Sequence, residues 1–230
     1  ATLMGSDDIC DYPLCETRIE GQWRLYFPAL INADRNDGFT LCGKGTVDGN
    51  GLKAWKAFWI RWKWNKNLSN LDEQRPRLLF ISNSSHVTVA EVTLQNSHFW
   101  TTHIYKCDHV RYLSCNILAP HGPVLAPSSD AIDIDVCHDV HIKDCYINVN
   151  DDSVVLKGGK GINAAELPEN GENQRILVED CRYSAKRLYI DQPDRWAFYI
   201  WDKLEHIENP TIEDKINLLK GDSPYGKCIY

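Results

Sequence analysis

Four segments in the middle of the chain repeat one pattern, and this repeat constrains the fold more than any other feature. In each segment an apolar residue is followed five positions later by Val or Cys: Val87 and Val92, Val110 and Cys115, Val140 and Cys145, Ile176 and Cys181. The β-branched, alternating character of residues 87–97, 110–120, 140–150 and 176–186 predicts one short strand in each. The chain is therefore expected to stack similar units.

A second strand pattern precedes two of these segments in the same register. It ends in Cys107 and in Cys137, three residues before Val110 and Val140. The spacing between repeats grows along the chain, and we assign the growth to loops at 120–129 and 158–173, on one corner. Coils that stack at about 4.8 Å can grow only at their corners, so the pattern predicts a parallel β-helix from about residue 20 to 183.

The repeat also places three cysteines, Cys115, Cys145 and Cys181, in one column. We interpret them as small buried hydrophobic residues rather than as disulfide partners or metal ligands. The chain has nine cysteines, an odd number, and no CxxC spacing, so no disulfide framework can be deduced and the redox compartment stays open.

Charge and hydropathy exclude two classes of partner. The net charge of −7 argues against nucleic acid, which attracts basic surfaces. No apolar run approaches the roughly 20 residues that cross a bilayer, so no membrane partner is expected.

Three aspartates are the strongest candidates for chemistry. Asp130 opens the strand 130–137, and Asp152 opens the next one, with Asp151 beside it. The alignment that brings these carboxylates together also stacks inward-facing residues in pairs: Ile132 with Val154, and Ile134 with Leu156. Clustered carboxylates repel and raise at least one pKa, so the cluster is a candidate catalytic site.

Glycoside hydrolysis by inversion suits such a cluster, because one protonated carboxyl group serves the leaving oxygen and one ionised carboxylate serves as the base for a water molecule. The alternative is that Asp130, Asp151 and Asp152 cap corners, as Asp often does. The spacing of the three aspartates is equally consistent with a catalytic cluster and with corner-capping residues.

Five motifs, in this order, resemble the polygalacturonases and related pectinases of glycoside hydrolase family 28 over residues 1–183. They are Gly45-Thr46-Val47-Asp48-Gly49-Asn50-Gly51, Arg75-Pro76-Arg77-Leu78-Leu79-Phe80, Asn96-Ser97-His98-Phe99-Trp100, Ser129-Asp130-Ala131-Ile132-Asp133 and Asn150-Asp151-Asp152. The resemblance implies an all-β, right-handed parallel β-helix and a secreted enzyme acting on pectic polysaccharide by inverting hydrolysis, without cofactor. We expect a monomer.

The resemblance also implies roles for single residues. Asp151 would be the general acid, and Asp130 and Asp152 would hold the attacking water. The family usually has Asn-Thr-Asp where this chain has Ser128-Ser129-Asp130. Lys157, on the strand after Asp152, would contact a uronate carboxylate, although a solvated lysine is as consistent with the sequence.

Two other groups of residues have a structural and a functional interpretation. Four tryptophans crowd positions 55–64, and we favour packing against the solenoid over sugar stacking. His138 and His141 resemble a metal site, but alternation along a strand points them to opposite faces, so no metal is expected.

The resemblance stops near residue 183. The family's Gly-His-Gly and Arg-Ile-Lys motifs do not occur, and the expected histidine position falls in 184–188, which reads SAKRL. Apolar residues at helical spacing predict a helix within 209–221, so 184–230 is expected to be a divergent, partly helical segment after a β-helix of residues 1–183. Residues 1–8 resemble the interior of a coil, so we expect the first coils to be missing.

The sequence therefore predicts a polygalacturonase-like hydrolase that, in this chain, has little or no activity. Open sheet edges at both ends would expose it to aggregation. A calcium-dependent pectate lyase and a non-catalytic carbohydrate-binding β-helix remain alternatives.

Overall fold

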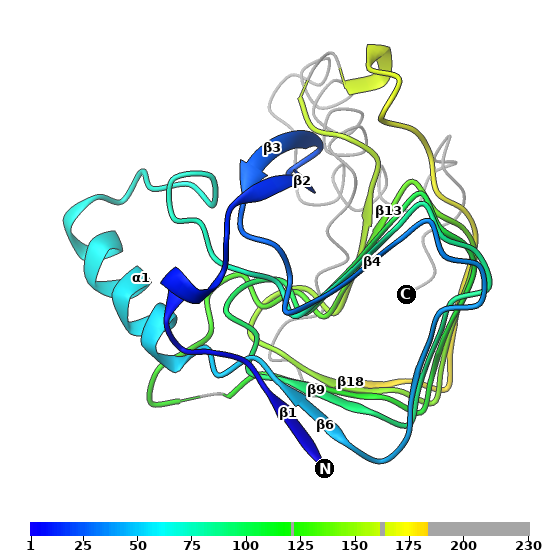
Figure 1. The fold of residues 1–230 in the computed structure, drawn as a ribbon, viewed down its shortest axis with the longest axis horizontal. Coiled ribbons are helices and arrows are strands. Elements are labelled where there is room, and N and C mark those ends of the chain that lie inside the picture. Colours follow the sequence, from blue (N-terminus) through cyan, green and yellow to red (C-terminus); the bar gives the residue numbers. More distant parts are fainter. Residues whose placement is uncertain (121, 162–163, 184–230) are drawn as a thin grey trace, which may run out of the picture. The chain divides into compact units, whose positions relative to one another are not determined.

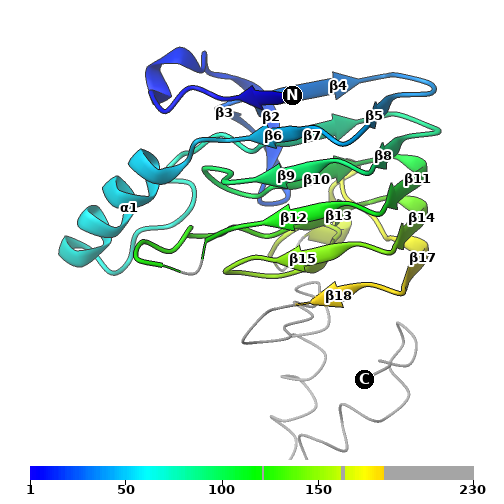
Figure 2. The same cartoon turned by 90° about the horizontal axis from the view of Figure 1, so that it is seen from below.

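The computed structural model describes residues 1–120, 122–161 and 164–183, and these form a solenoid of three parallel sheets (Figures 1 and 2). Sheet I contains β1 (Thr2–Met4), β6 (Thr46–Asp48), β9 (Thr93–Gln95), β12 (Asn116–Leu118), β15 (Tyr146–Asn148) and β18 (Arg182–Tyr183). Sheet II contains β4 (Ile31–Asp34), β7 (Leu79–Ser82), β10 (Thr102–Tyr105), β13 (Ile132–Asp135) and β16 (Val154–Lys157). Sheet III contains β5 (Thr40–Cys42), β8 (Thr88–Ala90), β11 (Asp108–Leu113), β14 (His138–Lys143) and β17 (Gln174–Glu179).

The register that the repeat predicted is present in the strand pairs. Val140 pairs with Val110 on one side and with Ile176 on the other. In sheet II, Ile132 lies against Val154. The right-handed parallel β-helix is therefore confirmed.

The prediction of one strand per repeat segment is wrong, because each segment bends from sheet III into sheet I. The residue at each bend has a positive φ: 59° at Glu91, 52° at Ser114, 53° at Asp144 and 53° at Asp180. This left-handed conformation ends one strand and starts the next after a sharp turn. The cysteine column follows directly after the bends.

The interior of the solenoid is filled by stacked apolar side chains. In sheet I, Leu94, Ile117 and Ile147 pair in register and are fully buried. Cys115 and Cys145 are buried free thiols of the same core, as the sequence predicts, whereas Cys181, the third cysteine of the column, is half-buried and packs against this core.

The insertions lie on two corners, not on one. Residues 120–129 separate β12 from β13, where sheet I turns into sheet II, whereas 158–173 separate β16 from β17, where sheet II turns into sheet III. The second insertion holds a short 3-10 helix, η2 (Ala164–Glu166). The expectation of a single corner was wrong. The spacing of a sequence repeat shows which coil contains a longer loop, but it does not show at which corner of the coil the loop lies.

The helix α1 (Leu52–Trp64) follows β6 and precedes β7, at the corner between sheets I and II. The four tryptophans of the sequence prediction belong to it. Trp55 and Phe58 are buried, and the Trp55 indole Nε1 donates to the Ser97 carbonyl at 2.9 Å. The packing interpretation therefore holds for Trp55, but Trp64 is 88% exposed.

An antiparallel hairpin, β2 (Cys15–Ile19) and β3 (Gln22–Tyr26), departs from the coil pattern, after a 3-10 turn η1 (Ile9–Asp11). It contacts the outer face of sheet II, where Arg18 Nε donates to Asp135 Oδ2 at 2.9 Å.

None of the helices in the part of the chain that the structure describes could span a bilayer. The helix predicted within 209–221 and the division after residue 183 involve residues outside the described part.

Candidate active site

Asp130 and the pair Asp151 and Asp152 lie on adjacent coils, at the corner where sheet I turns into sheet II. Asp130 precedes β13, and Asp152 precedes β16. The Ala131 amide donates to the Asp152 carbonyl at 2.9 Å, and the Asn150 amide donates to Ser129 Oγ at 3.0 Å. The backbone ladder of the solenoid thus holds the two segments side by side.

The three aspartates differ in exposure. Asp130 is 6% and Asp152 is 8% exposed, whereas Asp151 is open to solvent. The Asp152 amide donates to Asp151 Oδ1 at 3.1 Å, which orients the exposed carboxylate. The corner therefore presents one outer carboxyl group and two inner ones.

Lys157, at the end of β16, lies inside this cluster. Its ammonium Nζ is 3.1 Å from Asp133 Oδ1, 3.9 Å from Asp130 Oδ2 and 4.2 Å from the centre of the Trp100 ring. The side chain is 21% exposed. Lys157 is therefore a counterion of the carboxylates and not simply a solvated surface lysine.

Burial and charge perturb the titration of the inner groups. Burial, followed by repulsion from Asp133, raises the pKa of Asp130 well above its usual range, while Lys157 acts in the opposite direction. Burial also raises the pKa of Asp133 to about 6, again against the pull of Lys157. For Lys157 itself, burial lowers the pKa, but the neighbouring carboxylates outweigh burial and raise it. The lysine thus stays charged, and the carboxylates are stronger bases than exposed ones.

Sequence reasoning did not assign a role to Asp133. In β13, Ile132 and Ile134 belong to the solenoid core, so Asp133 points to the outer face of sheet II, where it is fully buried. The strand register contained a signal for this contact. Lys157 pairs with Asp135, which is the next outward-facing residue after Asp133 in β13, so the lysine lies near Asp133. What the sequence could not show is the cover that the hairpin places over this face.

A second buried network lies beside the carboxylates. Arg77 Nη1 donates to His103 Nδ1 at 2.5 Å, so that nitrogen is an acceptor and His103 Nε2 carries the proton, facing Asp135 Oδ2 at 3.3 Å. Burial is the main cause that lowers the pKa of His103 to about 4. His103 is a neutral structural group, 1% exposed, and does not present an imidazole to the corner.

The sequence singled out His138 and His141 as a possible metal site. His141 Nε2 lies 3.0 Å from Glu179 Oε1 on the neighbouring coil. Across residues 1–120, 122–161 and 164–183, no group of three or more His, Cys, Asp or Glu side chains could hold a metal ion.

Comparison with known proteins gives one family. The model of the glycosyl hydrolases family 28 matches residues 15–170. A polygalacturonase of Chamaecyparis obtusa is 33% identical over 81% of this chain and 37% of its own length, and a probable polygalacturonase of Vitis vinifera is 29% identical over 69% of this chain and 31% of its own length. The chain thus spans about a third of these relatives.

Solved structures agree on the fold. A hyperthermoactive exopolygalacturonase from Thermotoga maritima superposes with a TM-score of 0.62 at 22% identity, covering 79% of this chain and 46% of that one. The polygalacturonase from Erwinia carotovora also gives a TM-score of 0.62, at 21% identity and with the same coverage.

Proposed function

Because the chain belongs to the glycosyl hydrolases family 28, we propose that its carboxylate corner hydrolyses α-1,4-linked galacturonan, or a close pectic relative, with inversion and without a cofactor. The observation that carries this proposal is the meeting of Asp130, Asp151 and Asp152 from two adjacent coils. Its relatives are named as polygalacturonases. We propose that the chain acts outside the cell and as a monomer.

The exposure of each carboxyl group supports its role. Asp151, the outer group, can reach the glycosidic oxygen of a bound polymer and act as general acid. Asp130 and Asp152, the inner groups, are suited to hold a water molecule and take its proton. In an inverting hydrolase the two roles belong to groups about 6.5–9.5 Å apart, with the water between them.

Lys157 supports the base in two ways. Its charge opposes the rise in the pKa of Asp130, so a base strengthened by burial can still ionise at a working pH. The exposed part of its side chain also lets a uronate carboxylate approach, and we propose Lys157 as a substrate-binding residue on that basis.

The same lysine argues against a lyase. Elimination in a pectate lyase requires a basic residue that removes the α-proton, and such a residue must be neutral when it acts. The Asp133 and Asp130 carboxylates raise the pKa of Lys157 and keep it charged.

We further propose that this chain hydrolyses slowly. Residues 184–188 contain no histidine where the family has one, and no Arg-Ile-Lys motif follows. Misplacement of catalytic groups by about 1 Å can cost about 10²-fold in rate.

The test is incubation of the monodisperse chain with polygalacturonate, with and without chelator, next to Asp151→Asn. The hydrolase proposal expects new reducing ends without ultraviolet absorbance, insensitive to chelator and lost in the variant. Unsaturated, absorbing products that disappear with chelator would establish the lyase. Binding of oligogalacturonate by both proteins without any product would establish a carbohydrate-binding module.

A further inference from the structure

The helix α1 carries a concentration of positive charge in an acidic chain. It contains Lys53, Lys56, Arg61 and Lys63, and no Asp or Glu occurs between residues 52 and 64, whereas the whole chain has a net charge of −7. A local charge of the opposite sign to the whole can recruit a partner that the net charge would repel.

Two of these four cations form ion pairs with carboxylates of the described residues, and two do not. Arg61 pairs with Glu73 at 2.6 Å, and Lys53 lies 3.9 Å from both Asp7 and Asp8. For Lys56 and Lys63, no carboxylate of the described residues lies within ion-pair distance. These two ammonium groups are available to an anionic ligand.

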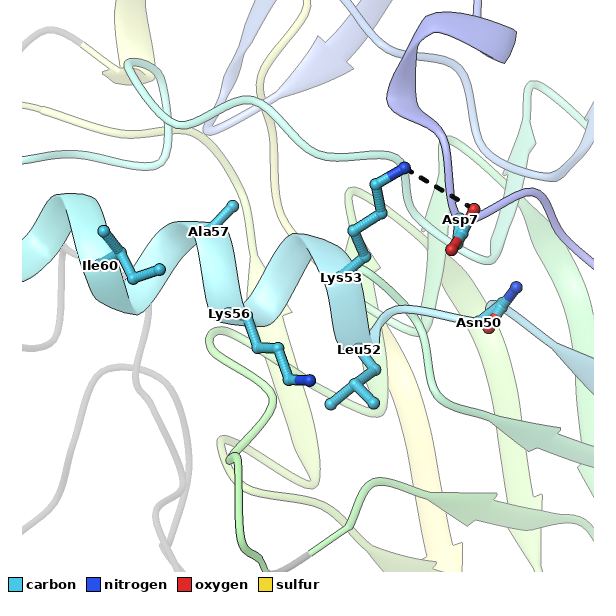
Figure 3. A pocket seen from close by; sticks show the side chains of 7 residues that line it. All are labelled: Asp7, Asn50, Leu52, Lys53, Lys56, Ala57 and Ile60. Carbon is cyan, nitrogen blue, oxygen red and sulfur yellow. Dashed lines mark ion pairs between the residues drawn. The ribbon is translucent and has the colours of Figure 1, made fainter.

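Apolar side chains accompany the free lysines. Leu52, Ile60 and Trp64 lie on one line of the helix with Lys56 among them, and Ile60 and Trp64 are 60% and 88% exposed. A hollow of about 480 Å³ lies against this part of α1, with the Lys56 side chain extending beside Leu52 (Figure 3). An exposed Trp next to lysines offers a flat face and charge together.

The helix is attached to the corner that carries the aspartates. It leaves the solenoid between sheets I and II, where the segments before β13 and β16 also turn (Figures 1 and 2). Trp59 Nε1 donates to the Leu125 carbonyl at 2.8 Å, in the loop that leads to Asp130. A polymer long enough to pass the carboxylates can therefore extend to α1.

We propose that the exposed face of α1 is an accessory binding surface for an anionic polysaccharide, in which Lys56 and Lys63 pair with uronate carboxylates and Trp64 packs on a sugar ring. This inference deepens the proposed function and rests on it for the substrate class. The surface requires a chain longer than the one that fills the carboxylate corner, so it favours polymer over short oligomers.

The apolar content of this face favours a polysaccharide over a lipid surface. Of the five aromatic residues of the helix, Trp55 and Phe58 are buried, Trp59 and Trp62 are half-buried, and Trp64 is exposed. The exposed apolar side chains, Leu52, Ile60 and Trp64, form one narrow line with lysines, whereas interfacial helices bury a broad apolar face in the bilayer.

The test compares Lys56→Ala/Lys63→Ala and Trp64→Ala with a charge-matched control, Lys44→Ala/Lys106→Ala, which removes two lysines elsewhere. All are made in an Asp151→Asn background, so that polygalacturonate stays intact, and calorimetry at two salt concentrations gives the Kd. Loss of two exposed ion pairs is expected to weaken binding of the polymer about 2- to 30-fold. The effect should shrink at high salt, while the control binds like the parent.

Three results would contradict the proposal that α1 binds an anionic polysaccharide. They are equal binding by the double variant and its control, binding of phosphatidylserine vesicles but not of polygalacturonate, or a dimer by light scattering that Trp64→Ala abolishes. Failure of the proposed function is a separate result: with Asp151 restored, no cleavage of polymer or oligomer occurs, while the α1 variants still weaken polymer binding.

Discussion

Lys157 Nζ lies 3.1 Å from Asp133 Oδ1, so a charged pair sits behind the carboxylate corner, with Asp133 fully buried and Lys157 partly exposed. Removing one member of a buried pair leaves the other uncompensated, which costs more than the pair itself contributes. The pair also ties β13 to β16, the two strands that follow Asp130 and Asp152.

We predict that Lys157→Met destabilises the protein more at high pH than at low pH. The loss is expected to be about 3–5 kcal/mol near neutral pH, because buried Asp133, which ionises with a pKa of about 6, loses the cation that pairs with it. Below about pH 4 the carboxyl groups of Asp133 and Asp130 are protonated in the folded protein with or without the lysine, so the cost falls. Urea unfolding from pH 4 to 8 measures this. A destabilisation that is the same at all pH values would show that the ammonium does not act through these carboxylates.

The titration of Asp133 gives a second prediction for the same pair. Carbon NMR of the aspartate side chains should show a midpoint near 6 in the parent and a higher one in Lys157→Met, since the lysine holds this pKa down. Lys157→Arg keeps the charge and should titrate more like the parent. An unchanged midpoint in Lys157→Met would contradict the ion pair.

The His103 side chain predicts a dependence of protein stability on pH whose sign is opposite to that of Asp133. Its pKa is about 4 in the folded protein and about 6.5 when unfolded, so the unfolded chain binds the extra proton between these values. The stability that this group contributes is present above pH 6.5 and is lost as the pH falls to about 4. Asp133, whose pKa is raised, opposes this in the parent between about pH 4 and 6.

The variant His103→Asn keeps an acceptor for Arg77 but cannot titrate. We expect its stability deficit relative to the parent to shrink by on the order of 3 kcal/mol between pH 7 and pH 4. Chemical denaturation at each pH gives this difference. A deficit that is constant over this range would mean that His103 is not held neutral.

The buried cysteines of the solenoid core make a prediction about redox conditions. Cys107, Cys115, Cys137 and Cys145 are buried free thiols. We therefore expect the melting temperature of the β-helix to be the same with and without dithiothreitol. A decrease in the presence of reductant would show that a disulfide contributes to the core.

The sequence was sufficient to predict what depends on periodicity. Register across coils fixed the stacking of Val110, Val140 and Ile176, and it brought Asp130 next to Asp151 and Asp152, because strands in a solenoid repeat one alignment. The bends at Ser114 and Asp144 were missed, since alternation continues through a left-handed residue that changes the direction of the strand.

What the sequence could not give depends on segments outside the repeat. The hairpin β2–β3 covers the outer face of sheet II and turns Asp133 and His103 from surface positions into buried ones. The helix α1 falls in an insertion without a counterpart in the other coils. Contacts of this kind join residues far apart in the chain, so no local sequence pattern predicts them.

The most direct test of the carboxylate corner follows the anomeric form of the products by proton NMR during digestion of polygalacturonate. We predict that the first product from the α-linked polymer is the β-anomer, that it is lost in Asp151→Asn, and that the rate is at least about 10²-fold below that of the Erwinia carotovora polygalacturonase assayed alongside. An α-anomer, product formation unaffected by the variant, or no product above the enzyme-free background would contradict inverting hydrolysis at Asp130, Asp151 and Asp152. A rate equal to that of the reference enzyme would contradict the proposed loss of activity.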